Sequence, residues 1–487
     1  MKTKSILTLA DSYKYAHAFQ YPSNMVSMFD YMASRGGKYS HIVPVGLSYY
    51  LQEYISKPVT MEHIERTAVM AASHGVPFDI VGWNHIVAEH GGYLPIRIKA
   101  IPEGTILPVG LTQLTVESTD PKVAWVAGFV ETILMMTYYP TMVATKSYHI
   151  KQMLLKYGSP EWAQFALHNF GNRACHCPES AALSGFAHAT QFSGTDNFNS
   201  LFFMEDYYGQ PATEPAAYSV WASEHSSTTS NCKGTTKRER IEEEEDFVYR
   251  MLLANPDRPI MSFVADSTDV YVFTICCTAK GSRIRELIES RPHQKLMLRP
   301  DSGDPIEVIA LMLRIMLEAE LPTLSDESKK EKHLFRDFGI LWGDGITTDG
   351  IENILEMFTT HTEASGGEGI PFAAENFVFG MGGGLATVDM HRDTSKYAIK
   401  CSSVTLDQED CNFAQTTDVD VYKDPITDPG KASKKGKLTT WFDTEAKEYI
   451  EGPVDKQPNM HCIDILYVVY ENGLLPNAPT MASIRSN

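Results

Sequence analysis

The stretch LMLRPDSGDPIEVIALMLRI, residues 296–315, decides the fold class. A short apolar run ends at Arg299, a polar loop follows, and a second apolar run begins soon after Asp304. Asp304 with Glu307 forms the D-x-x-E pattern of a helix start, and Pro305 suits the first helical position. The stretch therefore predicts a buried strand, a loop that carries charge, and a helix.

The same rhythm recurs through the middle of the chain. The helix expected at residues 349–360 places Ile351, Ile354, Leu355 and Phe358 on one face. Repeated strand–loop–helix units imply parallel strands joined by right-handed crossovers. We therefore expect an irregular, closed or nearly closed α/β barrel of mostly parallel strands, with an open doubly wound sheet as the alternative. The expected strands are residues 165–170, 216–220, 260–265, 295–298, 338–342 and 376–380.

The two ends of the chain have a different pattern. Residues 94–118 alternate in short stretches broken by Pro and Gly, which indicates antiparallel strands, and residues 123–137 are helical in pattern. The last part of the chain again reads as strands. We expect an N-terminal α+β layer at 1–150, a catalytic barrel at 151–395, and a β-rich part at 396–487 that returns to the N-terminal layer.

Composition excludes several classes of protein. The chain has 487 residues, 43% of them hydrophobic, and a net charge of −19, which argues against a protein that coats nucleic acid. No apolar run is long enough to span a bilayer, and the first residues do not read as a signal peptide. The eight cysteines lack paired CxxC spacing, so reduced thiols and a cytoplasmic location are expected.

The polar loops after the strands are expected to meet on one face. In a parallel barrel all of these loops emerge at the same end, although Asp and Gly are also common in ordinary turns. The acidic run Glu242–Asp246 is expected only to be a solvated helix start. The loops are Asn172–Arg173, Ser223–His225, Asp266–Asp269, Arg299–Asp301, Gly343–Asp344 and Gly382–Gly384.

These loops suggest a sugar-phosphate site with a basic clamp. The glycines at 382–384 allow backbone N–H groups to approach a phosphate, and Gly343 allows a similar close approach. Asp344 can accept from a ribose hydroxyl. Arg299 can clamp an oxyanion, and Asp301 can help to hold hydrated magnesium or fix Arg299.

His225 is the candidate nucleophile or base. A lone histidine is more often structural, but Asp269 could orient this imidazole.

Several motifs together resemble the nicotinate/nicotinamide phosphoribosyltransferase family over nearly the whole chain. Ala265 and Asn172 depart from the usual family pattern. The motifs are ADSYKYAHAFQYP (10–22), GWNHI (82–86), LPIRIKAIPEG (94–104), ETILMMTYYP (131–140), HNFGNR (168–173), GTD (194–196), EHSS (224–227), RPDSGDP (299–305), GDG (343–345), GGGL (382–385) and VYKDPITDPGKASKKGKL (421–438).

The resemblance implies a reaction. Nicotinamide and 5-phosphoribosyl pyrophosphate would give nicotinamide mononucleotide and pyrophosphate, assisted by Mg²⁺ and stimulated by ATP as co-substrate through a phosphohistidine at His225. The enzyme would be a homodimer with active sites at the subunit interface. No nucleic acid or membrane partner is implied.

The resemblance also assigns roles to individual residues. Phe170 and Tyr13 of the second subunit would sandwich the nicotinamide ring, and Asp196 would accept from its carboxamide. Arg299 would lie near the ring, with His225, Asp269 and Asp301 as the catalytic group. The bound phosphates, pyrophosphate and ribose would be contacted by Arg173, Gly343, Asp344, Gly382, Gly383, Arg35, Arg392, Lys400 and Lys423.

Three alternatives stay open at this point. The chain could be a nicotinate phosphoribosyltransferase, a non-catalytic dimeric binding protein of the same fold, or a barrel sugar-phosphate isomerase.

Overall fold

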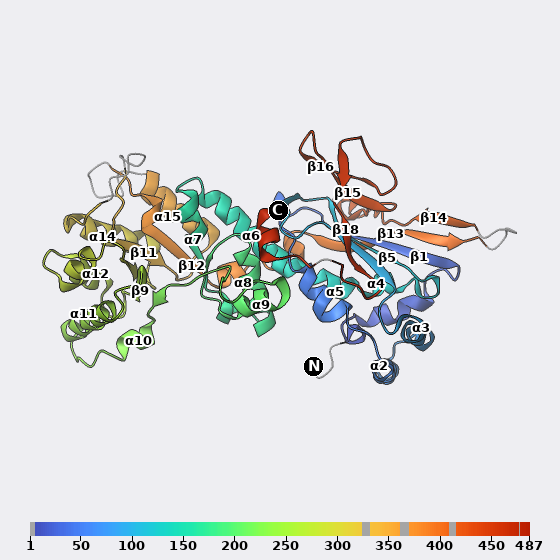
Figure 1. The fold of residues 1–487 in the computed structure, drawn as a ribbon, viewed down its shortest axis with the longest axis horizontal. Coiled ribbons are helices and arrows are strands. Elements are labelled where there is room, and N and C mark those ends of the chain that lie inside the picture. The colour runs from blue at the N-terminus through green and yellow to red at the C-terminus, as the bar shows by residue number, and fades with distance from the viewer. Residues whose placement is uncertain (1–4, 324–331, 361–369, 409–414, 477) are drawn as a thin grey trace. The chain divides into compact units, whose positions relative to one another are not determined.

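The parallel strands expected in the middle of the chain form one sheet. The computed structural model describes residues 5–323, 332–360, 370–408, 415–476 and 478–487. Its contacts divide into two compact units (Figure 1). Unit 1 comprises residues 1–145, 203–211 and 389–487, and unit 2 comprises residues 146–202 and 212–388.

Unit 2 is built on the seven-stranded parallel sheet. The strand order is β7-β6-β12-β11-β10-β9-β8. The strands are short and their central members are almost completely buried, which explains the uninterrupted apolar runs in the sequence. The bounds are β6 (Leu167–Asn169), β7 (Gly194–Thr195), β8 (Trp221–Ala222), β9 (Ile260–Val264), β10 (Lys295–Arg299), β11 (Phe338–Trp342) and β12 (Phe377–Met381).

The two edge regions of this sheet are linked by one segment. Gly194 on β7 forms a parallel bridge with Tyr218, which lies just before β8. The Thr195 N–H donates to the Tyr218 carbonyl at 2.8 Å, and the Tyr218 N–H donates to the Ser193 carbonyl at 2.8 Å. The sheet therefore curls round on itself, which confirms the predicted α/β class with mostly parallel strands.

Helices follow the strands of unit 2, and Figure 1 shows α12, α14 and α15 around β9 and β11. Helix α15 (Thr348–Thr360) buries the four apolar residues predicted for its inner face. Helix α14 (Pro305–Glu318) begins as predicted, with the Asp304 carboxylate accepting from the N–H groups of Ile306 and Glu307. The others are α7 (Pro160–Phe165), α8 (Pro178–Ala189), α10 (His225–Thr229), α11 (Lys237–Ala254), α12 (Val270–Thr278), α13 (Arg283–Glu289) and α16 (Gly383–Ala386).

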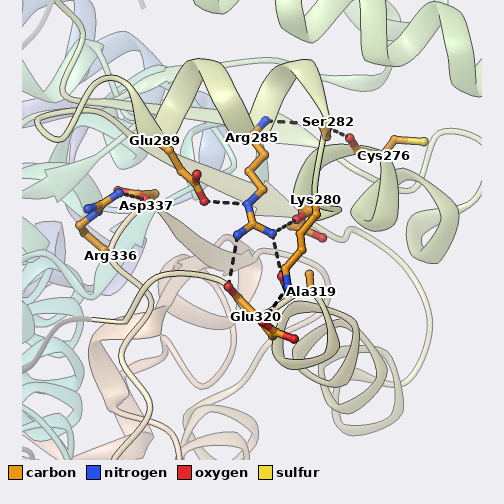
Figure 2. A network of polar contacts seen from close by, with 10 residues as sticks. Cys276, Lys280, Ser282, Arg285, Glu289, Ala319, Glu320, Arg336 and Asp337 are labelled. Carbon is orange, nitrogen blue, oxygen red and sulfur yellow. Dashed lines mark hydrogen bonds and ion pairs between the residues drawn. The ribbon is translucent and has the colours of Figure 1, made fainter.

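A buried arginine ties three of these helices together, as Figure 2 shows. Arg285 on α13 donates to Glu289 one turn along at 2.7 Å. Its guanidinium also donates to the carbonyls of Thr278 at 3.0 Å, Ala319 at 2.7 Å and Glu320 at 3.2 Å. These carbonyls lie at the ends of α12 and α14, where helices leave acceptors without partners. One planar cation therefore satisfies acceptors from two other helices.

Unit 1 is built on a six-stranded antiparallel sheet of order β14-β13-β1-β5-β3-β18. Strands from the end of the chain lie at both edges of strands from its beginning, which confirms the predicted layer built from the N- and C-terminal parts. The bounds are β1 (Met25–Ser34), β3 (Ile96–Ala100), β5 (Thr112–Ser118), β13 (Tyr397–Asp407), β14 (Thr416–Asp420) and β18 (Tyr467–Glu471).

Smaller elements complete unit 1. A three-stranded sheet has the order β16-β15-β17, and β2 pairs with β4. The bounds are β2 (His41–Ile42), β4 (Leu107–Pro108), β15 (Leu438–Asp443), β16 (Glu448–Pro453), β17 (Cys462–Asp464), α1 (Leu47–Tyr50), α2 (Met61–His74), α3 (Ile80–His90), α4 (Val126–Phe129), α5 (Glu131–Met135) and α17 (Met481–Ser486). Helices α6 (Tyr138–Leu154) and α9 (Asn199–Tyr208) have residues in both units.

Among the described residues, no helix combines the length and the apolar character needed to cross a bilayer.

Candidate active site

The carboxyl ends of the parallel strands carry most of the predicted site residues. Because parallel strands end at the same edge of a sheet, the segments that follow them lie near one another. The predicted residues from this edge of unit 2 are Phe170 and Arg173 after β6, Asp196 after β7, His225 after β8, Asp269 after β9, Arg299 and Asp301 at β10, Gly343 and Asp344 after β11, and Gly382 and Gly383 after β12.

Asp301 connects the two central groups of the site. Arg299 Nη2 donates to Asp301 Oδ1 at 3.0 Å, and Asp301 Oδ2 lies 3.7 Å from His225 Nε2. Arg299 and Asp301 are mostly buried, whereas the His225 side chain is 46% exposed. A guanidinium and an imidazole from distant parts of the sequence thus share one carboxylate, and the imidazole is open to solvent.

The other contacts of His225 come from the loop after β9. Its Nδ1 lies 3.2 Å from Ser267 Oγ, and its Nε2 lies 3.6 Å from Asp266 Oδ1. Asp266 also accepts a hydrogen bond from the Ser302 hydroxyl. Asp266 and Ser267 were not singled out from the sequence, although both lie in the polar loop expected to face the site.

Asp269 occupies a different position from the one expected. Its carboxylate caps helix α12 and accepts from the N–H groups of Tyr271 and Val272, each at 3.1 Å. In the part of the chain that the structure describes, the ring nitrogens of His225 instead contact Ser267, Asp266 and Asp301. The physical reason is local: an Asp directly before an apolar helix satisfies N–H groups that have no other partner.

A buried carboxylic acid supports the loop after β9. The Thr268 hydroxyl donates to Glu244 on helix α11, and the Glu244 side chain is fully buried. Burial raises the pKa of Glu244 above its usual value, although the hydrogen bond from Thr268 opposes this. The expectation that Glu242–Asp246 is a solvated helix start is therefore wrong: α11 begins at Lys237, the acidic run lies inside it, and Glu244 is buried.

Phe170 packs directly against the barrel. The Arg299 guanidinium lies 5.2 Å from the centre of its ring, within the range of a cation–π contact. A Cβ placed on Gly380 would lie 2.1 Å from Phe170 Cε2, and one on Gly343 would lie 3.2 Å from the same atom. The ring can lie here because position 380 is glycine, and glycine at 343 avoids a further tight contact.

Asp196 is held by a residue from the linking segment before β8. Ser219 Oγ donates to Asp196 Oδ1 at 2.5 Å, and His168 Nδ1 lies 4.0 Å from the same oxygen. Burial lowers the pKa of His168, although the Asp196 carboxylate opposes this. Asp196 is part-exposed, and a carboxylate that accepts one hydrogen bond has lone pairs left for others. Ser219 was not predicted from the sequence.

The predicted phosphate and ribose groups lie at the same edge. Asp344 and Arg173 are exposed. Gly382 precedes the short helix α16, which begins at Gly383. A Cβ on either glycine would meet its nearest neighbour at 3.4 Å, an ordinary contact. These glycines are therefore not required by crowding, and their small size leaves the backbone accessible.

The remaining predicted residues belong to unit 1. The Tyr13 side chain is 56% exposed and packs beside His17, with ring centres 5.3 Å apart. Lys400 lies on β13 opposite Tyr31 of β1. The other predicted cations of this unit are Arg35 directly after β1, Arg392 in a 3₁₀ turn, and Lys423 after β14.

The acidic groups around His225 fit a magnesium ion that keeps water and phosphate ligands. Mg²⁺ is usually bound by one or two carboxylates together with substrate phosphates. Among the described residues, the buried Asp266 Oδ1 accepts no hydrogen bond, and it lies 3.6 Å from His225 Nε2, while Asp301 Oδ2 lies 3.7 Å from the same nitrogen. These two carboxylates are oxygen ligands of the required kind.

Comparison with known families identifies two matching regions. The profile of the nicotinate phosphoribosyltransferase (NAPRTase) family matches residues 165–454. The profile of the nicotinamide phosphoribosyltransferase N-terminal domain matches residues 5–98.

Curated relatives match over almost the full length. A protein named nicotinamide phosphoribosyltransferase from Xanthomonas campestris pv. campestris (strain 8004) is 37% identical, covering 99% of this chain and 98% of its own. One with the same name from Acinetobacter baylyi is 28% identical, covering 98% and 96%.

Solved structures share the fold. Nicotinate-nucleotide pyrophosphorylase from Pyrococcus furiosus has a TM-score of 0.55 at 15% identity, covering 99% of this chain and 93% of its own. Human nicotinic acid phosphoribosyltransferase has a TM-score of 0.54 at 14% identity, covering 98% and 92%.

Proposed function

Because the chain belongs to the nicotinate phosphoribosyltransferase (NAPRTase) family, we propose that it transfers the phosphoribosyl group of 5-phosphoribosyl 1-pyrophosphate to nicotinamide. The products are nicotinamide mononucleotide and pyrophosphate. The observation that carries this proposal is the group formed by Phe170, Arg299, Asp301 and His225 at the carboxyl edge of one parallel sheet.

The reaction suits a site that offers charge and position. The bond between ribose C1 and pyrophosphate breaks while the ring nitrogen of nicotinamide bonds to C1, so positive charge develops at C1 and negative charge on the departing pyrophosphate. Catalysis then depends on cations near the leaving group and on the placement of the ring. Phe170 offers a flat surface for the nicotinamide ring. Positive charge is supplied by Arg173 and by Arg299, whose guanidinium lies near the Phe170 ring.

The choice of nicotinamide over nicotinate rests on Asp196. An ionised carboxylate accepts a hydrogen bond from the –NH₂ of an amide but repels the carboxylate of nicotinate. Ser219 holds one oxygen of Asp196 in place. The relatives named nicotinamide phosphoribosyltransferase support the same choice.

ATP stimulation is proposed to act through His225. Transfer of the γ-phosphoryl group breaks its bond to the β-phosphate oxygen, forms a bond to a ring nitrogen of His225, and releases ADP. The exposed imidazole, with Ser267 fixing one nitrogen, suits this role. A bound Mg²⁺ would offset the negative charges of the phosphates, and Asp266 and Asp301 would hold it.

The active unit is proposed to be a homodimer. Tyr13 of a second subunit would cover the ring face opposite Phe170, and the cations of unit 1 would contact phosphate and pyrophosphate. A mixing experiment tests this: Tyr13→Ala and Phe170→Ala proteins are unfolded together and refolded. If each site takes Tyr13 from one subunit and Phe170 from the other, mixed dimers regain an intact site. Activity no higher than that of the separate variants would contradict the shared site.

The reaction is tested by mass spectrometry of products from nicotinamide, phosphoribosyl pyrophosphate, Mg²⁺ and ATP. Nicotinamide mononucleotide is expected, and its absence under all conditions would favour a non-catalytic binding protein. A second assay uses ATP labelled in the γ-phosphate: acid-labile label on the wild type and none on His225→Ala is expected. Label of equal intensity on both proteins would contradict the role of His225.

Selectivity is tested with Asp196→Asn and a matched surface control, Asp206→Asn. The ratio of kcat/KM for nicotinamide to that for nicotinate should fall about tenfold or more in Asp196→Asn, because one charge repulsion is removed. The control should keep the wild-type ratio. An unchanged ratio in Asp196→Asn would show that another group selects the substrate, and a wild-type preference for nicotinate would assign the sister activity.

A further inference from the structure

Three side chains of types that can bind metal ions converge in unit 1, outside the group proposed for catalysis. His85 and His90 lie on α3, and Asp120 follows β5. His85 Nε2 lies 2.7 Å and His90 Nε2 lies 2.6 Å from the same oxygen, Asp120 Oδ2. The three ligand atoms lie within 4.8 Å of one another. Two imidazoles and one carboxylate are thus directed at a single point.

The arrangement is held by the surrounding fold. Asp120 Oδ1 accepts from the Lys122 N–H at 2.8 Å, which leaves Oδ2 facing the two imidazoles. Trp83 on α3 packs against Trp125, with ring centres 5.1 Å apart, so the two segments that carry the ligands are joined by the core. Gly91 ends α3 in the left-handed conformation immediately after His90. The ligands are therefore fixed by neighbours rather than by their own contacts alone.

We propose that His85, His90 and Asp120 form a binding site for a zinc-class divalent ion. Two imidazole nitrogens and a carboxylate oxygen are a donor set that Zn²⁺ accepts, whereas Mg²⁺ and Ca²⁺ prefer oxygen ligands. Each imidazole binds through Nε2 in the neutral form, with its hydrogen on Nδ1. Water completes a tetrahedral set of four ligands.

The distances allow this with a small adjustment. Bonds of about 2.0–2.1 Å to a tetrahedral Zn²⁺ place the ligand atoms about 3.3 Å apart. Each imidazole nitrogen would therefore move away from Asp120 Oδ2 by about 0.6–0.7 Å. The two imidazole nitrogens, which lie within 4.8 Å of each other, would also have to lie about 3.3 Å apart. Side-chain rotation of that size leaves the backbone of α3 in place. The ion would join the end of α3 to the segment after β5 and so stabilise unit 1.

The test uses the full chain, stripped of metal with a chelator and dialysed. Zn²⁺ affinity is measured by competition with a chromophoric chelator for the wild type, for His85→Asn/His90→Asn, and for the control His461→Asn. His461 pairs with one carboxylate, Glu445, at 3.1 Å, so its removal deletes a similar pair but no converging site. All three proteins keep every cysteine, so zinc bound by thiols cancels in the comparison.

The double variant should lose one tight Zn²⁺ per chain, with an affinity lower by about 100-fold or more. The wild type and the control should retain it, and Zn²⁺ should raise their unfolding temperature more than it raises that of the double variant. Equal Zn²⁺ binding by the wild type and the double variant would overturn the proposal.

A second measurement needs no variant, in case the double variant does not fold. Co²⁺ added to the wild type should give the intense visible bands of a tetrahedral site without a thiolate charge-transfer band. Zn²⁺ should also slow hydrogen exchange at residues 86–90 and 119–123. The absence of both changes would overturn the proposal.

Discussion

The stability of unit 1 in Asp30→Asn, relative to the wild type, should increase as the pH rises. Asp30 lies on the central strand β1 and is almost completely buried. Its Oδ1 accepts no hydrogen bond from the residues that the structure describes. Burial is the largest cause that raises its pKa from 3.8 to about 7, and repulsion from Glu131 is the next. The charge of Lys14, a hydrogen bond with Cys401 and the charge of Lys400 lower the pKa and so reduce this rise. The folded chain therefore keeps a proton that the unfolded chain has already lost.

The size of the effect follows from the two pKa values. Between pH 4 and pH 7 the unfolded state ionises and the folded state does not, so the wild type loses stability as the pH rises and loses no more above pH 7. The full difference is about 4 kcal/mol, because each pKa unit corresponds to about 1.4 kcal/mol. Asparagine lacks this ionisation. The stability of Asp30→Asn relative to the wild type should therefore increase by about 2–3 kcal/mol between pH 5 and pH 8.

Hydrogen exchange followed by mass spectrometry measures this locally. The protection of the β1 amides in the variant and the wild type is compared at the same pH, from pH 5 to pH 8, so that the intrinsic dependence of exchange on pH cancels. Asp455→Asn, on an exposed turn, is the matched control and should show no trend. A difference between Asp30→Asn and the wild type that stays constant with pH would refute the reasoning.

Three further substitutions test side-chain contacts. Gly380→Ala places a Cβ 2.1 Å from the Phe170 ring, and displacing the ring should raise the KM for nicotinamide by about three- to tenfold. The control Gly350→Ala, whose Cβ would meet its nearest neighbour at 3.3 Å, should keep the wild-type KM. An unchanged KM in Gly380→Ala would argue against stacking on Phe170. Arg285→Lys should destabilise unit 2 by about 2 kcal/mol in urea unfolding, because an ammonium cannot span the carbonyls of Thr278 and Ala319 as a guanidinium does. Full stability with lysine would mean that the charge alone matters. Glu103→Gln should cost about 1–3 kcal/mol in thermal unfolding, because its carboxylate accepts from the N–H groups of Gly46 and Ser48 and an amide –NH₂ cannot, and a neutral result would show that the side chain rearranges.

The sequence predicted the fold where long-range and local patterns agree. The start of α14 at Asp304 and the buried face of α15 follow from rules that act within a few residues. Strand β7 was missed because two residues, Gly194 and Thr195, give no periodicity. The strand expected at 216–220 is instead β8 at 221–222, because the preceding residues form the bridge to β7.

The site was predictable to a similar extent. The set of loops at the barrel edge followed from topology, whereas the partner of each side chain did not. Asp269 illustrates the reason: the same four-residue loop offers two carboxylates, and only the folded backbone determines that Asp266 faces the imidazole and Asp269 caps a helix. Glu244 was unpredictable for a related reason, because its neighbours in the sequence are acidic and only its own position on α11 turns inward.

The position of Asp301 between a guanidinium and an imidazole has a thermodynamic consequence. The two carboxylate oxygens of Asp301 lie 3.0 Å from Arg299 Nη2 and 3.7 Å from His225 Nε2, so a change of charge on the imidazole acts on the carboxylate that Arg299 also contacts. If the imidazole acquired negative charge, the carboxylate would be repelled from it and would strengthen its attraction to Arg299, the residue that lies over the Phe170 ring. Charging of His225 and binding of a ring on Phe170 would then be energetically linked, and by reciprocity a ring bound on Phe170 would alter the lifetime of the charged imidazole.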